Sequence, residues 1–124
     1  MKVLAIDFDS TIAEAVEPYD GSIGKMFDGV DYYINKLYNE GYYIIIWTCR
    51  GDVALVEMID WLDSKGIIYH KVNENAPMDV LGFKPLPKIF ANAYIDDRNL
   101  GGLPLNKYNK PDWKKIYSMV KENV

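Results

Sequence analysis

Residues 3–11 read Val-Leu-Ala-Ile-Asp-Phe-Asp-Ser-Thr, and this stretch decides the fold. Residues 2–8 open with a continuous apolar run of strand length, the pattern of a strand that is covered on both faces. Asp7 and Asp9 stand two positions apart, so an extended chain points both carboxylates to the same side. We therefore expect a buried strand with an acidic site at its carboxyl end.

The pattern of strands and helices continues outward from this segment. Further apolar runs of strand length occupy residues 42–48, 67–72 and 90–95. Apolar residues at steps of three and four predict amphipathic helices over residues 23–38, over 52–65 and from 111 onward. Strands that alternate with helices predict right-handed crossovers, a mainly parallel sheet and the α/β class.

Polar residues follow all four predicted strands, at residues 7–9, 48–50, 73 and 96–98. In parallel sheets of this class, ligands bind outside the carboxyl ends of the strands. These four positions are therefore the first place to look for a functional site.

Composition limits the class of protein. The chain has 124 residues, of which 49% are apolar and 26% charged, so we expect one domain over residues 1–124. The longest apolar runs, residues 3–6 and 42–47, are too short to cross a bilayer. A single cysteine and an N-terminus without a signal-peptide pattern predict a cytoplasmic protein with no membrane anchor.

Charge is unevenly distributed along the chain. The net charge of -4 excludes a generally basic nucleic-acid binder, so nucleic acid is expected only as a substrate. Residues 84–115 hold seven basic and three acidic residues, a local charge of +4, whereas the remainder carries -8. Such a segment favours an anionic partner, although an ordinary solvated face explains it equally well.

The acids that end the first and fourth strands suggest a metal site. They are Asp7, Asp9, Asp96 and Asp97. Carboxylates that converge in a cleft repel one another, and a hard divalent cation relieves this repulsion. Mg²⁺ fits best because it prefers oxygen ligands and commonly joins carboxylates to a substrate phosphate, whereas histidine and cysteine are too scarce for zinc.

These residues, in this order, resemble the motifs of the haloacid dehalogenase superfamily. Asp7-Phe8-Asp9-Ser10-Thr11 is similar to motif I, Asp-x-Asp-x-Thr, and the resemblance extends over residues 2–98. The other matches are Thr48 to motif II, Lys88 to motif III with Lys84 as its competitor, and Asp96-Asp97 to motif IV. The resemblance implies a three-layer Rossmann-like fold with strand order 4-1-2-3.

The resemblance also assigns roles. It implies Asp7 as the nucleophile and Asp9 as the general acid and base. It places Thr48 and Lys88 on the phosphate oxygens. Mg²⁺ would be held by Asp7, the backbone carbonyl of Asp9 and Asp96, with Asp97 as a further ligand or a partner of the ligands. Arg50 and Arg98 would contact the rest of an anionic substrate, or form surface ion pairs.

The segments that carry a cap domain in larger members of the superfamily are short here. Residues 10–24 can form only a small flap, and residues 73–87 are a loop or a brief helix. The protein therefore resembles a capless member. Its substrate selectivity would come from the flap, from residues 101–109 or from a neighbouring subunit of a homo-oligomer.

The sequence thus predicts an enzyme, a Mg²⁺-dependent phosphomonoester hydrolase that acts through an aspartyl-phosphate. Its substrate would be a nucleotide, a polynucleotide end or another phosphorylated molecule. One alternative is a regulatory module that binds Mg²⁺ and phosphate with little or no turnover. A phospho-accepting receiver domain is disfavoured, because Val72-Asn73 supplies no acid after the third strand.

Overall fold

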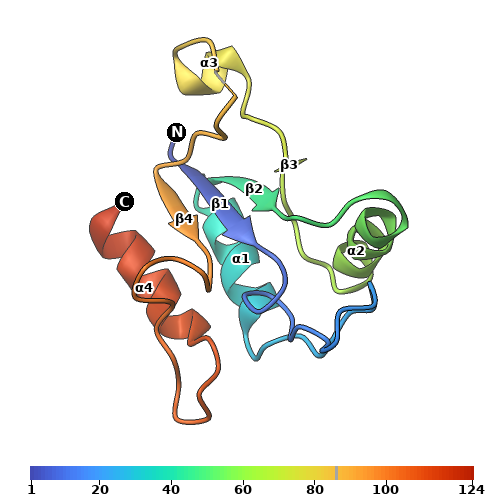
Figure 1. Ribbon diagram of the computed structural model, residues 1–124. Helices are drawn as coiled ribbons and strands as arrows, with labels where there is room; N and C mark the ends of the chain where they lie inside the picture. Colours follow the sequence, from blue (N-terminus) through green and yellow to red (C-terminus); the bar gives the residue numbers. More distant parts are fainter. Residues whose placement is uncertain (86) are drawn as a thin grey trace.

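The computed structural model describes residues 1–85 and 87–124 and shows a parallel α/β fold (Figure 1). The sheet has the order β3-β2-β1-β4, and every neighbouring pair is parallel. This order is the predicted 4-1-2-3 arrangement read from the other edge. In chain order the elements are β1 (Val3–Asp7), α1 (Val30–Asn39), β2 (Tyr43–Trp47), α2 (Asp52–Ser64), β3 (Lys71–Val72), α3 (Met78–Leu81), β4 (Ala93–Ile95) and α4 (Trp113–Asn123).

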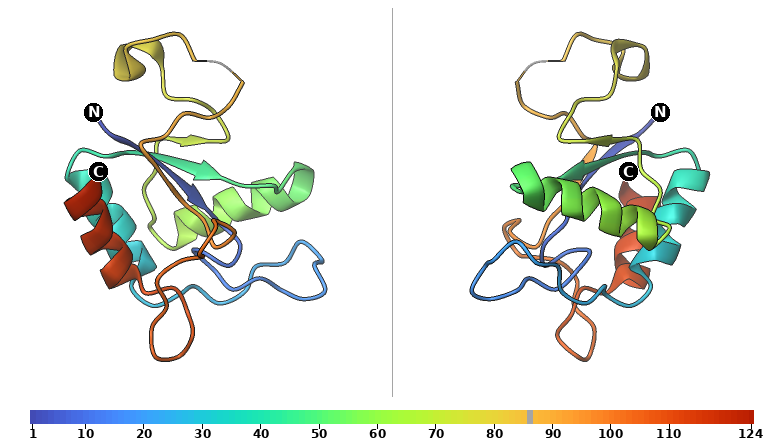
Figure 2. Two further views of the ribbon diagram at one scale, coloured as in Figure 1. Left: turned by 60° about the vertical axis from the view of Figure 1, so that its left-hand side comes forward. Right: turned by 90° about the vertical axis from the view of Figure 1, so that its right-hand side faces the viewer.

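The direction of the crossovers decides which face each helix covers. The chain moves from β1 to β2 to β3 in one direction, so right-handed crossovers place α1 and α2 on the same face. Leu4, Ile6 and Ile46 pack there against α1, α2 and α4. The return to β4 at the far edge carries α3 and its flanking loops over the other face, and Figure 2 shows α1 and α4 side by side away from α3.

Two predicted strands are shorter in the structure, because side chains replace backbone partners at their ends. The backbone N–H of Ile44 donates to the His70 ring Nδ1 at 3.0 Å, so the regular ladder with β2 begins at Lys71. The N–H of Val3 donates to the side-chain oxygen of Asn92 at 2.7 Å, and β4 begins one residue later.

The helix predicted from residue 23 begins at Val30. Residues 25–27 instead return along the flap: the N–H of Glu14 donates to the Lys25 carbonyl at 2.8 Å, and the N–H of Phe27 donates to the Ile12 carbonyl at 3.0 Å. At Gly24, an added Cβ would lie 2.2 Å from the Glu14 carbonyl oxygen, so only glycine permits this close approach. The flap is thus closed at its base.

Within the described part of the chain, no helix is both long and apolar enough to cross a membrane.

Candidate functional site

The carboxyl edge of the sheet gathers three aspartates from two neighbouring strands. Asp7 is the last residue of β1, and Ile6 pairs with Ile95, the last residue of β4. Asp96 and Asp97 follow directly, so the parallel register brings them beside Asp7. One carboxylate oxygen from each of these three residues lies within 4.8 Å of the others. We call Asp7, Asp96 and Asp97 the acidic cluster.

Burial, together with the neighbouring carboxylates, changes the protonation of Asp7. Burial, a hydrogen bond with Asp97 and the charges of Asp96 and Asp97 raise the pKa of Asp7 from 3.8 to about 8. The Thr11 hydroxyl, which donates to Asp7 Oδ2 at 3.1 Å, opposes this rise only in part. Without a cation, the protein's own residues therefore do not balance the charge of the cluster.

Thr11 ties the loop after β1 to the rest of the site. Its side chain is fully buried, and its Oγ1 accepts the backbone N–H of Asp97 at 3.2 Å. Its carbonyl accepts the indole N–H of Trp113, the first residue of α4, at 2.9 Å. The loop after β1 is consequently fastened to both the end of β4 and the start of α4.

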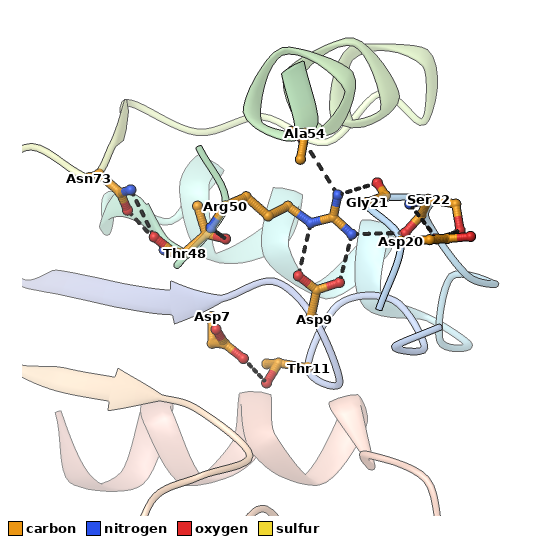
Figure 3. Close-up of polar contacts among 10 residues, drawn as sticks. All are labelled: Asp7, Asp9, Thr11, Asp20, Gly21, Ser22, Thr48, Arg50, Ala54 and Asn73. Carbon is orange, nitrogen blue, oxygen red and sulfur yellow. Dashed lines mark hydrogen bonds and ion pairs between the residues drawn. The ribbon is translucent and has the colours of Figure 1, made fainter. Parts of the chain in front are cut away.

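Asp9 points away from Asp7, contrary to the expectation that both carboxylates share one side (Figure 3). The chain leaves the extended conformation after Asp7: Ile12 N–H donates to the Phe8 carbonyl at 2.8 Å, and Ser10 has φ of 66°. This turn directs the Asp9 carboxylate to Arg50 and outside the acidic cluster. Whether the Asp9 carbonyl binds a metal stays a prediction.

The Arg50 guanidinium binds the Asp9 carboxylate through two hydrogen bonds. Nε donates to Asp9 Oδ2 at 2.8 Å and Nη2 to Oδ1 at 2.9 Å, the bidentate geometry that Arg forms with carboxylates. The other N–H groups donate to the carbonyls of Gly21 at 2.7 Å, Ser22 at 2.9 Å and, more weakly, Ala54 at 3.5 Å.

These contacts remove Arg50 from the residues that could bind a substrate. Its side chain is 2% exposed, and its guanidinium lies near the rings of Phe8 and Tyr19. Every N–H group of the guanidinium already has an acceptor. The predicted substrate contact is therefore replaced by a buried ion pair with Asp9, and the hydrogen bond with Asp9 raises the pKa of Arg50 further. The hydrogen bonds to the Gly21, Ser22 and Ala54 carbonyls join the flap to the first turn of α2.

Thr48 follows β2 and is held in place by Asn73, which the sequence placed at the same edge of the sheet without giving it a role. The Asn73 side-chain amide bonds both backbone groups of Thr48, accepting its N–H and donating to its carbonyl, each at 2.8 Å. Thr48 Oγ1 accepts the backbone N–H of Arg50 at 3.0 Å, which leaves the hydroxyl hydrogen to donate elsewhere. The signal for Asn73 in the sequence was its place directly after the third predicted strand, where parallel sheets carry ligand-binding residues. In the structure its φ is 53°.

The structure does not bring Lys88 to the acidic cluster. Lys88 precedes β4 and therefore lies toward the amino edge of the sheet, where its Nζ sits 5.4 Å from the centre of the Tyr94 ring. Lys84 lines the same pocket of about 390 Å³. Among the ion pairs of residues 1–85 and 87–124, none joins either lysine to the cluster.

Arg98 contacts the acidic cluster through its backbone N–H. Its N–H donates to Asp96 Oδ1 at 2.9 Å and closes the turn after β4, while its side chain is exposed. A substrate contact by this side chain stays a prediction.

Comparison with known proteins identifies one relative in detail. No protein-family model and no curated protein matches the chain. The solved structure of a conserved protein from Bacteroides thetaiotaomicron is similar with a TM-score of 0.79 and 33% sequence identity, over 99% of this chain and 92% of that one. This chain belongs to the same family as that protein. The description of the relative names no activity, so the chemistry must be argued from the residues.

The residues at the carboxyl edge fit a hard cation and a phosphate ester. The acidic cluster offers only carboxylate oxygens, the ligands that Mg²⁺ prefers, and the raised pKa of Asp7 reflects a charge that a cation would balance. The Thr48 hydroxyl supplies a donor from the neighbouring strand. The arrangement can bind a metal ion, present a carboxylate nucleophile and hold an anion.

Proposed function

We propose that the protein is a Mg²⁺-dependent phosphomonoester hydrolase that acts through an aspartyl-phosphate on Asp7. The observation that carries this proposal is the acidic cluster, in which a carboxylate at the end of β1 meets two carboxylates after β4. The raised pKa of Asp7 supports it, because burial and two neighbouring carboxylates disfavour a negative charge that a bound cation would offset. The motif resemblance described above supplies the reaction type.

Asp7, Asp96 and Asp97 would hold the metal ion, which when bound would offset the negative charge between a phosphate group and the carboxylates. In the first step, a carboxylate oxygen of Asp7 attacks phosphorus. The bond from phosphorus to the leaving oxygen breaks, and its electron pair goes to that oxygen. The proton for this oxygen would come from Asp9, whose carboxylate first has to leave the Arg50 guanidinium and take up a proton from solvent. The Thr48 hydroxyl donates a hydrogen bond to a phosphate oxygen.

In the second step, water attacks the phosphorus of the aspartyl-phosphate and Asp9 takes a proton from that water. The bond from phosphorus to the Asp7 oxygen breaks, and phosphate leaves. The Asp9 side chain is 29% exposed although Arg50 holds it, so a leaving group or a water can reach it. Lys88 has no part in this scheme, because no ion pair among residues 1–85 and 87–124 joins it to the acidic cluster.

The decisive experiment measures phosphate release from p-nitrophenyl phosphate with and without Mg²⁺, for the wild type and for Asp7→Asn. We expect Mg²⁺-dependent release by the wild type, a phosphorylated protein after acid quenching, and no release by Asp7→Asn. Asp79→Asn makes the same change on α3, outside the site, and should keep full activity. Undiminished phosphate release by Asp7→Asn would refute the mechanism.

One observation favours a second candidate function, a module that binds Mg²⁺ and phosphate with little turnover. Within the described part of the chain, no lysine contacts the acidic cluster, and the only arginine beside Asp9 is fully engaged. Calorimetric titration separates the two. A module would bind Mg²⁺ and inorganic phosphate and release no phosphate from any ester.

A further inference from the structure

A pocket of about 530 Å³ opens beside the acidic cluster, between the flap and the loop that precedes α4. Ser10, which follows Asp9, and Asp97 of the acidic cluster both line it. Both segments project from the carboxyl edge of the sheet, as Figure 1 and Figure 2 show. The volume of the pocket lies within the range typical of small-molecule sites. We call this cavity the flap pocket.

The charges that line the flap pocket are mostly negative. Three acids line it, Asp97, Glu14 and Glu17, against one base, Lys110, so its formal net charge is -2 without a metal ion. When Asp97 holds the proposed cation, Glu14, Glu17 and Lys110 leave a net charge of -1. Lys110 Nζ lies 3.1 Å from Glu14 Oε1, and this ion pair links the loop to the flap. A second phosphate group on a substrate would meet these carboxylates at short range and be repelled.

The same lining suits hydroxyl groups. The carboxylates of Glu14 and Glu17 accept hydrogen bonds, and Lys110 and the Asn109 amide donate them. The apolar side chains of Phe27, next to the flap, and of Leu103 and Leu105, in the loop, can cover the carbon atoms of a ring or chain. The exposed lysines 84 and 88, on which a polyanion could dock, lie instead at a separate pocket.

From this arrangement we propose that the flap pocket receives the alcohol part of the substrate, and that this alcohol is a compact, uncharged polyol such as a sugar. The proposal rests on the proposed function, because the phosphate of the ester would sit at Asp7 with its alcohol reaching past Asp97. It narrows the expectation from the sequence, which was a nucleotide, a polynucleotide end or another phosphorylated molecule. Glu17 and Lys110 then act as specificity-determining residues.

A matched pair of substrates tests the substrate class. Glucose 6-phosphate and glucose 1,6-bisphosphate share one body and differ by a phosphate group, so the ratio of their kcat/KM values reports the charge preference of the pocket. We expect the monophosphate to be preferred by roughly fivefold or more, from the repulsion between like charges. Preference for the bisphosphate would overturn the proposal, and so would hydrolysis of p-nitrophenyl phosphate with no hydrolysis of either glucose ester or of glycerol 1-phosphate.

Charge reversal locates the effect. Glu17→Lys should lower the preference for glucose 6-phosphate by roughly fivefold. Glu122→Lys changes the net charge equally on α4, outside the pocket, and should leave the preference unchanged. Equal effects of the two variants would show that total charge, and not this pocket, sets the preference.

A binding measurement keeps the pocket separate from the activity. In Asp7→Asn with Mg²⁺, added glucose 6-phosphate should shift the amide NMR signals of Gly101, Gly102 and Asn109, which line the pocket. Shifts confined to other residues would overturn the pocket assignment. A third outcome separates the two proposals: shifts at these residues in a protein that shows no Mg²⁺-dependent hydrolysis of p-nitrophenyl phosphate. That result would contradict the proposed function but support the polyol-binding pocket.

Discussion

Replacing Arg50 by methionine tests the role of the buried ion pair. The substitution keeps an unbranched side chain of similar reach and removes every donor to Asp9 and to the flap carbonyls. The Asp9 carboxylate would then remain partly buried without a partner. We expect the flap to loosen, because Arg50 also holds the carbonyls of Gly21 and Ser22.

The size of the effect follows from the burial of the two partners. Breaking a buried ion pair by removing one partner costs about 3–5 kcal/mol. The Arg50 side chain is 2% exposed but that of Asp9 is 29% exposed, so water offsets part of the loss and the lower end applies. We therefore expect Arg50→Met to lower the free energy of unfolding by about 3 kcal/mol, a large share of the stability of a domain of this size.

Urea denaturation followed by circular dichroism measures this change. Lys110→Met is the matched control, because it removes the ion pair of Lys110 with Glu14 of the flap, whose side chains are 50% and 40% exposed. An exposed pair should cost about 0.5 kcal/mol. In a double-mutant cycle, Arg50→Met should cost much less when Asp9 is already asparagine.

The reasoning is refuted if Arg50→Met costs no more than Lys110→Met, or if the cycle with Asp9→Asn shows no coupling. Arg50→Lys makes the result more specific. Lysine keeps the charge but lacks the planar fork, so it should restore only part of the lost stability.

Three further predictions concern the site. In metal-free protein, Asp7→Asn should raise the free energy of unfolding, and this gain should grow as pH rises from about 4 to about 8. The reason is that the pKa of Asp7 is higher in the folded than in the unfolded state. The contribution of Asp7 to stability is therefore most favourable below pH 3.8 and is lost as pH rises through about 8. Urea titrations across this pH range measure it, and a gain that does not depend on pH would contradict it. Mg²⁺ should raise the melting temperature of the wild type, reversibly with a chelator, and by much less in Asp96→Asn, as differential scanning fluorimetry would show. Asn73→Ala removes both hydrogen bonds to the Thr48 backbone. It should lower the free energy of unfolding, measured by urea denaturation, by about 1–3 kcal/mol and should also lower kcat. Unchanged stability would show that the turn after β2 does not depend on the Asn73 side chain.

The order and class of the main elements could be predicted from local pattern. Apolar runs of strand length and helices with a period of three to four depend on neighbouring residues, and the parallel sheet with its order follows from how such units connect. The convergence of Asp7 with Asp96 and Asp97 also follows, because parallel strands end at one edge. Element ends were less predictable, since amide and imidazole side chains close the ladders at Val3 and Ile44.

The partners of Asp9 and the position of Lys88 could not be predicted. Asp9 and Arg50 lie 41 positions apart, and nothing in their local sequence shows that the chain turns after Asp7 and aims one at the other. A spacing of eight residues before Asp96 likewise does not say whether Lys88 reaches the carboxyl edge or stays toward the amino edge beside Tyr94.

The sequence by itself determined the parallel sheet and the acids at its carboxyl edge, because both depend on backbone periods and on the chirality of crossovers. Only the tertiary structure decided that Arg50 is an internal clamp and that the flap pocket is acidic. Both depend on where loops turn and which side chains they bring into contact, and those contacts form between residues that no local pattern relates.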